Sequence, residues 1–282
     1  MTDTCAYLVN GEPCGVTLAG HRPYSRKRDG IPSSTALASV LDGGKSTSFG
    51  WAAAGITAEM AVHRGTEWRH LSVTDCDHAA KNLCQACRVL RSEFDRQWKA
   101  KADLGTHVHH LALSWAEGDT VDADPVIDPY LDALGAFYDE CAPTWVHLEA
   151  TVENDDPAWR GQFDAIADVL LDGERKRTLI DYKSGSLHFA AMAIQLTSYR
   201  RAKWVTTWED GAVVERKPMP EVDASAVLML RPDGEYRLIE LPTVHDRLLS
   251  VYADWEFQRE MDKAQKAWEK AEKDQIKEGV AA

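Results

Sequence analysis

The chain has 282 residues, of which 44% are hydrophobic and 27% are charged, with a formal net charge of −13 at pH 7. This length suits a chain that buries a proper core, as one large domain or one domain with appendages. No apolar run approaches about 18 residues, so we expect no transmembrane helix. The N-terminus, MTDTCAYLVNGEPC, lacks the basic region and apolar stretch of a signal peptide, which predicts a cytoplasmic protein.

The negative charge is concentrated in one part of the chain. Residues 117–156 contain many acidic side chains and neither lysine nor arginine, and they account for nearly the whole acidic excess. The rest of the chain is about neutral and has basic clusters. The acidic stretch is either a solvated surface or a face that docks a partner, so the net charge does not exclude a polyanionic ligand.

Four cysteines have spacings that suit a metal. Cys5 and Cys14, the latter followed by glycine, resemble one half of a zinc knuckle, and Cys84 and Cys87 have the C-x-x-C spacing that lets two thiolates bind one ion. Together they predict a Zn²⁺ site that ties the N-terminus to the later segment. The alternative is a plain helix with two incidental cysteines. We expect no structural disulfide in an intracellular chain.

Helical patterns dominate the first half of the sequence. Pro32-Ser33-Ser34 is typical of a helix start with serine as the N-cap, and a helical pattern follows through Leu41; residues 51–64 have an amphipathic pattern. Residues 88–101 are helical and basic. We expect a new helix to begin at Gly105-Thr106, with Thr106 as its cap. Residues 128–141 place aromatic side chains at helical spacing, which is more typical of a core than of a base-stacking platform.

One hairpin is predicted to bring charged residues together. Residues 163–171 and 178–183 read as strands, and the Asp172-Gly173 turn signal with the polar residues after it predicts a loop longer than two residues. The hairpin would bring Asp164 close to Asp181. Alternation places Asp181 and Lys183 on one face. Two carboxylates with a lysine predict a site for a hard cation such as Mg²⁺ or Mn²⁺.

The following residues predict a helix over 189–202. Gln195 and Tyr199 stand at i and i+4, on one face of that helix. Residues 174–203 are rich in lysine and arginine, which suits a polyanion that approaches the cation. Each short motif alone has an ordinary explanation: a D-x-K is usually a solvated strand charge, and Gln195 with Tyr199 can be a surface pair. The ordered set is more specific than any member.

The flanking segments complete an α/β expectation, with a mixed central sheet between helices. Residues 146–152 predict one strand that carries Glu149 on the face opposite its apolar residues. Residues 204–215 and 226–230 predict further strands, and 236–241 returns from a turn. Residues 245–277 predict a long charged helix that packs on the body or binds a partner. The predicted divisions are 1–104, 105–245 as the core, and 246–282.

The motif series resembles the RecB-like branch of the PD-(D/E)XK nuclease superfamily. Residues 161–164 match its G-x-x-D motif, residues 181–185 its D-Y-K-[ST]-G motif, and residues 195–199 its Q-x-x-x-Y motif. Residues 105–109 match the upstream G-T-x-x-H motif of that branch. The resemblance spans roughly residues 31–203 and implies a restriction-endonuclease-like core.

The resemblance also implies a role for each matching residue. His109, Asp164 and Asp181 would hold Mg²⁺ or Mn²⁺, with the main-chain carbonyl of Tyr182 as a further ligand. Lys183 would be the catalytic lysine, which orients or helps to deprotonate the attacking water, or steadies the phosphate. These assignments are what the family pattern implies for this chain.

Three further residues match supporting positions of the family. Glu149 stands where the family often has a glutamate on the preceding strand, and Gln195 and Tyr199 would shape the site and contact DNA. Some members carry an iron–sulfur cluster that uses three cysteines after the Q-x-x-x-Y helix. This chain has no cysteine after Cys141, so we expect no such cluster, and Zn²⁺ is the better candidate for the thiolates.

The implied function is a metal-dependent DNA nuclease, as an exonuclease that acts on DNA ends in recombination, repair or phage DNA metabolism. Its partners would be DNA and a recombination or phage protein, in a bacterial or phage-infected cell. Two alternatives stay open. One is a nuclease-fold protein that binds DNA or a partner without cutting, and the other is a zinc-stabilised scaffold in which the cysteines matter most.

Overall fold

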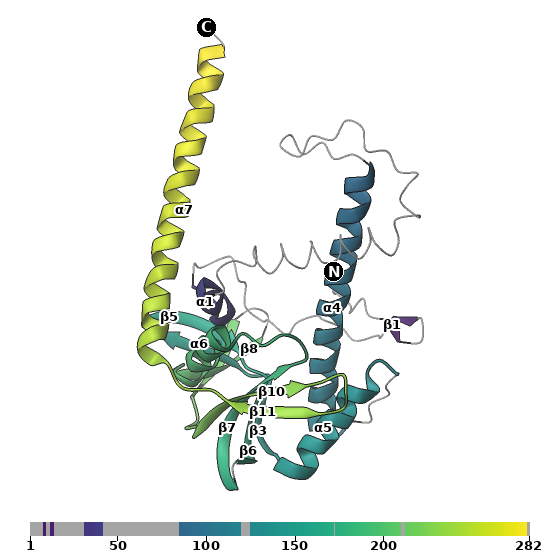
Figure 1. Cartoon of the computed structure of the whole chain (residues 1–282). Helices are drawn as coiled ribbons and strands as arrows, with labels where there is room; N and C mark the ends of the chain where they lie inside the picture. The colour runs from purple at the N-terminus through teal and green to yellow at the C-terminus, as the bar shows by residue number, and fades with distance from the viewer. Residues whose placement is uncertain are drawn as a thin grey trace.

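A computed structural model describes residues 8–9, 12–13, 31–41, 85–119, 125–171, 173–209 and 212–280. They form a mixed α/β architecture with one five-stranded and one four-stranded sheet (Figure 1). Two short strands, β1 (Leu8–Val9) and β2 (Glu12–Pro13), pair separately. No helix in this part of the chain is both long and apolar enough to cross a bilayer. The predicted α/β class is confirmed.

The five-stranded sheet has the order β11-β10-β7-β6-β3. Its strands are β3 (Thr144–Leu148), β6 (Ala165–Leu171), β7 (Glu174–Lys183), β10 (Ala224–Leu230) and β11 (Tyr236–Glu240). β10 is parallel to β7 and the other pairs are antiparallel, so the sheet is mixed. The parallel pair requires a crossover, and the chain makes it through α6 (Phe189–Arg200) and two further strands.

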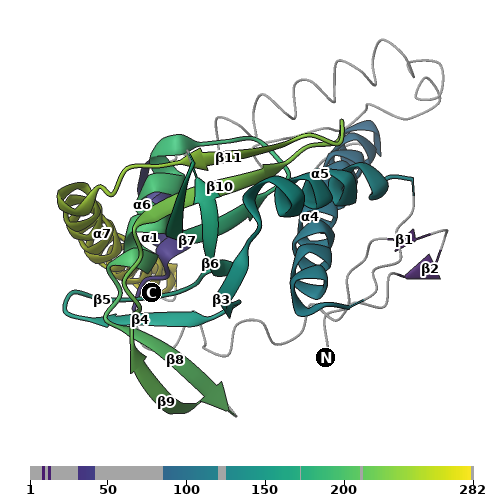
Figure 2. The ribbon, with the colours of Figure 1, turned by 90° about the horizontal axis from the view of Figure 1, so that it is seen from below.

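The second sheet has the order β5-β4-β8-β9 and is antiparallel throughout. Its strands are β4 (Thr151–Asp155), β5 (Ala158–Gln162), β8 (Trp204–Glu209) and β9 (Ala212–Pro218). The β8–β9 hairpin projects from the body (Figure 2). Because β4 and β5 lie directly before β6 in the chain, and β8 directly after α6, this sheet adjoins the central hairpin.

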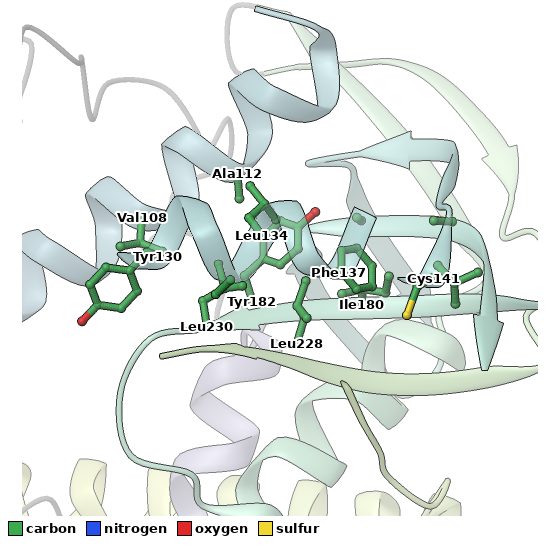
Figure 3. Packing of buried hydrophobic residues seen from close by; sticks show 14 of the residues in the cluster. Val108, Ala112, Tyr130, Leu134, Phe137, Cys141, Ile180, Tyr182, Leu228 and Leu230 are labelled. Atoms are coloured by element: carbon green, nitrogen blue, oxygen red, sulfur yellow. The ribbon is translucent and has the colours of Figure 1, made fainter. Parts of the chain in front are cut away.

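Helices cover both faces of the five-stranded sheet. The remaining helices are α1 (Ser34–Leu41), α4 (Gln85–Glu117), α5 (Asp128–Cys141) and α7 (His245–Val280). On one face, Phe137 and Leu134 of α5 pack against Ile180 and Tyr182 of β7 (Figure 3). On the other face, Leu179 of the same strand joins a cluster that includes residues of α6. β7 is therefore apolar on both faces, as expected for a central strand.

A third cluster attaches α1 and α7 to the body. Leu37 of α1, Trp159 of β5, Ile194 of α6 and Leu248 of α7 are buried together. The rest of α7 extends away from the body (Figure 1), and its Trp268 is 64% exposed. The predicted aromatic face of α5 lies in the core, and the acids of α5 are exposed, as a solvated surface requires: Asp128, Asp132, Asp139 and Glu140.

The prediction of one strand over residues 146–152, within a single sheet, is wrong. Glu149 has a φ of 43°, in the left-handed region, and it separates β3 from β4, which belong to different sheets. Glu149 therefore lies at a bend and not on the outer face of a strand. The one strand predicted over residues 204–215 is also wrong, since the chain turns between Glu209 and Ala212 to form the β8–β9 hairpin.

Two predicted boundaries also need correction. Leu171 pairs directly with Glu174, so the turn between β6 and β7 has two residues and the polar residues after it belong to the strand. Gly173 supplies the positive φ of 80° that such a tight turn needs. Thr106 caps no helix, because α4 continues through it, and the predicted division between residues 104 and 105 lies inside α4.

The cap of α1 is confirmed, because the Ala36 N–H donates to Ser33 Oγ at 3.1 Å. The helix predicted over residues 51–64 lies outside the described residues.

Candidate functional site

Two aspartates meet at the end of the central hairpin. Asp164 directly precedes β6, and Ala165 pairs with Ile180, so Asp164 lies beside Asp181 of β7. The Tyr182 N–H donates to Asp164 Oδ2 at 2.6 Å. Asp181 is 3% exposed although it is ionisable, and carboxylates are rarely buried without a partner. The predicted approach of the two carboxylates is confirmed.

Lys183 lies on the same face as Asp181, as alternation predicts. Its Nζ forms an ion pair with Asp181 Oδ2 and also donates to the Tyr182 carbonyl oxygen at 3.2 Å. Burial alone would lower the pKa of Lys183, but the carboxylates of Asp181 and Asp164 outweigh that effect and raise its pKa. The lysine is therefore positively charged at neutral pH in this arrangement.

His109 reaches the same place from helix α4. Its Nδ1 lies 3.6 Å from Asp164 Oδ2, and its ring meets the Tyr182 ring edge to face at 6.0 Å between centroids. Gly105, one turn earlier, lies beside the residue that follows β7: a Cβ built there would meet Ser184 Oγ at 3.4 Å, an ordinary van der Waals distance. The G-T-x-x-H segment therefore packs against the end of β7.

The Asp164 carboxyl group has an unusual environment. Burial is the main cause that raises its pKa, and the neighbouring Asp181 carboxylate raises it further. His109, Lys183 and the Tyr182 N–H act in the opposite direction, without cancelling the rise. The Asp164 carboxyl group, buried beside a second carboxylate, therefore lies where positive charge is favoured.

Gly161 and Tyr199 join two of the motifs by packing. A Cβ at Gly161 would lie 2.7 Å from Tyr199 Cδ1 and would also clash with Ser34 Oγ, so only glycine fits. Gln195 Nε2 donates to Tyr199 Oη at 2.7 Å and fixes the ring. Tyr199 is 3% exposed and lies within the core, so its role in shaping the site stays a prediction. Contact with DNA stays a prediction for Gln195, which is partly exposed.

Glu149 borders the site through its backbone. Its N–H donates to the Asp164 carbonyl oxygen at 2.8 Å, so the bend after β3 is tied to the start of β6. Its carboxylate is close enough to contribute to the raised pKa of Tyr182, which burial and Asp164 raise more strongly. Sequence reasoning did not predict that Ser34 and Ser184 lie against the two motif glycines, because no sequence pattern links such distant positions.

The donors at this site suit a hard cation. The carboxylates of Asp164 and Asp181, the Tyr182 carbonyl and His109 supply the oxygen and imidazole ligands that Mg²⁺ and Mn²⁺ accept. Within the described ranges, no three histidine, cysteine, aspartate or glutamate side chains converge on one point. However, Asp181 and the Tyr182 carbonyl already hold one positive group, the Lys183 ammonium. The residues therefore fit a cation in type and in charge.

The predicted zinc ligands cannot be placed. Cys5, Cys14 and Cys84 lie outside the described residues, and Cys87 belongs to α4 with a side chain that also lies outside them. The Zn²⁺ site stays a prediction. Cys141 is buried, with Sγ 3.5 Å from Tyr236 Oη.

Comparison of the chain with protein-family models finds no match, and comparison with curated proteins finds none.

Proposed function

We propose that the protein is a metal-dependent DNA nuclease with a restriction-endonuclease-like core, similar to the RecB-like branch of the PD-(D/E)XK superfamily. One observation carries the proposal: His109 of α4, Asp164 at the start of the central hairpin, and Asp181 and Lys183 of β7 converge at one end of a mixed sheet. If each of these residues only stabilised the fold, the four would not need to lie at the same place. Buried like charges beside a lysine are typical of a catalytic site.

Each residue has a definite task in the proposed reaction. Asp164, Asp181 and the Tyr182 carbonyl would hold Mg²⁺ or Mn²⁺, which polarises a phosphate and lowers the pKa of a bound water. His109, whose Nδ1 lies 3.6 Å from Asp164 Oδ2, would join them as a further ligand. Lys183 places its ammonium beside the same oxygens, where it stabilises the negative charge that develops on the phosphate in the transition state.

The proposed substrate is DNA with a free end. The resemblance supports this choice, and Lys183 supplies a cation beside the carboxylates, whereas Arg175, Lys176 and Arg177 lie at the opposite end of β7. The proposed setting is the cytoplasm of a bacterium or phage-infected cell, with a recombination or phage protein as a further partner.

The test is cleavage of end-labelled linear DNA and of circular DNA in Mg²⁺ or Mn²⁺. We expect the wild type to degrade linear DNA, and Asp181→Asn and Lys183→Ala to lower the rate about 10²–10³-fold, the effect of removing one group that stabilises transition-state charge. Asp168→Asn is the matched control, because Asp168 lies in the same hairpin but pairs with Arg177 at 2.9 Å, away from the site.

Each outcome has a definite meaning. Loss of cleavage in both site variants but not in Asp168→Asn would support the proposal, and cutting of circles would change it to an endonuclease. If the pure wild type binds DNA but never cuts it, the non-catalytic binding protein becomes the better reading.

A further inference from the structure

One face of the four-stranded sheet carries aromatic and cationic side chains. Glu153 pairs with Arg160 across β4–β5 and with Trp204 across β4–β8, and Thr206 pairs with Arg216 across β8–β9. Directly paired residues share a face. We call this set, with the adjoining Lys203, the tryptophan–arginine face: Glu153, Asp155, Arg160, Lys203, Trp204, Trp208 and Arg216.

A buried glutamate organises the face. Glu153 is 3% exposed, and its two carboxylate oxygens accept from Arg160 Nε at 2.8 Å and from an Arg216 terminal nitrogen at 2.8 Å. Charge-assisted bonds of this length fix the orientation of both guanidinium groups. The two arginines are therefore held in place before any ligand arrives.

Both tryptophan rings are also held. Arg160 Cζ lies 5.3 Å from the centre of the Trp208 ring, and Lys203 Nζ lies 5.0 Å from the centre of the Trp204 ring. Trp208 Nε1 donates to Thr206 Oγ1 at 3.0 Å. Rings with fixed planes lose little conformational entropy when a flat ligand stacks on them.

The positive charges of this face point toward solvent. The side chains of Lys203 and Arg216 are 58% and 47% exposed. Three cations stand against two carboxylates, of which Glu153 is buried and Asp155 is shared between Lys203 and Arg216. The exposed charge is therefore positive, within a chain whose net charge is −13.

The face leads to the candidate site. β5 ends at Gln162, two residues before Asp164, and β4 begins at Thr151, two residues after Glu149. A cleft of about 470 Å³ is lined by Gln162 and Trp208 of this face, by Glu215 and Lys217 of β9, and by Glu149 from the edge of the site. A ligand on the face is thus continuous with the end of the central hairpin.

We infer that the tryptophan–arginine face binds single-stranded DNA and guides it to the carboxylate site. Bases would stack on Trp204 and Trp208, and phosphates would lie against Lys203 and Arg216. Aromatic side chains with a cationic groove are the general means of binding single strands without sequence preference. This inference rests on the proposed function, and it adds the form of the substrate and its path.

A protein ligand would also use arginine and tryptophan. DNA is favoured because the exposed charge is positive and because the face is continuous with a site for phosphodiester chemistry. If the wild type binds no single strand, a protein becomes the ligand that this chemistry fits.

The experiment measures binding of a fluorescent oligothymidylate to the full chain by anisotropy, in EDTA to prevent cleavage. We expect Trp208→Leu to weaken binding about tenfold, through the loss of one stacked base. Lys203→Gln and Arg216→Gln should each reduce the slope of log K against log salt by about 0.7, the value for one phosphate contact on a single strand. Melting temperatures show that each variant is folded.

Lys266→Gln is the matched control. Lys266 is exposed on α7, the helix that extends away from the body (Figure 1). It should leave both the affinity and the salt slope unchanged. Equal effects of Arg216→Gln and Lys266→Gln, or no effect of Trp208→Leu, would overturn the inference, as would a wild type that binds no single strand.

Cleavage separates this inference from the proposed function. If the wild type cuts DNA and the variants of the tryptophan–arginine face cut it with unchanged KM, the inference about this face is wrong and the proposed nuclease activity stands. If the wild type binds through the face but cuts nothing in Mg²⁺ or Mn²⁺, the proposed nuclease activity fails and the binding surface stands.

Discussion

Two buried carboxylates, one in each sheet, differ in how their charge is balanced. The Glu153 side chain is 4% exposed and is held by two arginines, whereas that of Asp181 is 5% exposed and has one lysine, which it shares with a carbonyl oxygen. Asp181 also lies beside a second carboxylate, Asp164. A buried carboxylate whose charge is fully balanced by cationic side chains supports the fold. A buried pair of carboxylates that keeps an excess of negative charge is a candidate for binding a cation.

The largest loss of stability is expected when the cluster of Glu153 with its two arginines is broken. Glu153→Gln would leave Arg160 and Arg216 facing each other with no anion between them, and removal of one partner from a buried ion cluster costs about 3–5 kcal/mol. Urea unfolding measures the change in the free energy of unfolding. Glu215→Gln is the control, since its pair with Lys217 is exposed and is worth less than about 1 kcal/mol. A loss below about 1 kcal/mol in Glu153→Gln would refute the structural role.

An intermediate loss of stability is expected at Gly161, where β5 of the four-stranded sheet packs on α6. Gly161 of β5 packs on Tyr199 of α6, so Gly161→Ala forces the ring or the backbone to shift and should cost about 1–3 kcal/mol. Gly185→Ala is the matched control: a Cβ there meets nothing within 4 Å, and its φ is not positive. We expect Gly185→Ala to be neutral or stabilising by about 0.4–1 kcal/mol. Equal unfolding curves for the two variants would contradict the close packing at Gly161.

The smallest effect on stability is expected at Asp181. Asp181→Asn removes an ion pair with Lys183, but it also removes the repulsion with Asp164, so unfolding should change by about 1 kcal/mol or less. Asp181→Asn should therefore change the cleavage rate strongly and stability little, whereas Glu153→Gln should do the reverse. A loss of about 3 kcal/mol in urea unfolding would instead make Asp181 a structural residue like Glu153.

The hairpin was readable from sequence because β6 and the second half of β7 are mostly apolar. Asp164 stands just before the first of these runs, and Asp181 and Lys183 at the end of the second, and the structure brings them together. His109 was placed by motif alone, since nothing local in α4 distinguishes it from His107 and His110. Its approach to Asp164 depends on the packing of the whole helix.

The second sheet was not predicted, for local reasons. Glu149 adopts a left-handed φ that non-glycine residues seldom take, so no turn residue marked the break between β3 and β4. Asp210-Gly211 is a typical hairpin turn sequence. It stands in a polar segment, however, and the alternation of side chains on either side of it is also the pattern of one continuous strand. The buried role of Glu153 depends on Arg216, 63 residues away, and no local pattern links them.

The central claim is that Asp164 and Asp181 hold a divalent cation while the other carboxylates of the hairpin do not. The most direct measurement is a Mn²⁺ titration followed by electron paramagnetic resonance, on the wild type, Asp164→Asn, Asp181→Asn and Asp168→Asn. We predict one saturable site in the wild type and in Asp168→Asn, and its loss in the two site variants. Equal Mn²⁺ binding by all four proteins, or none by the wild type, would contradict the account.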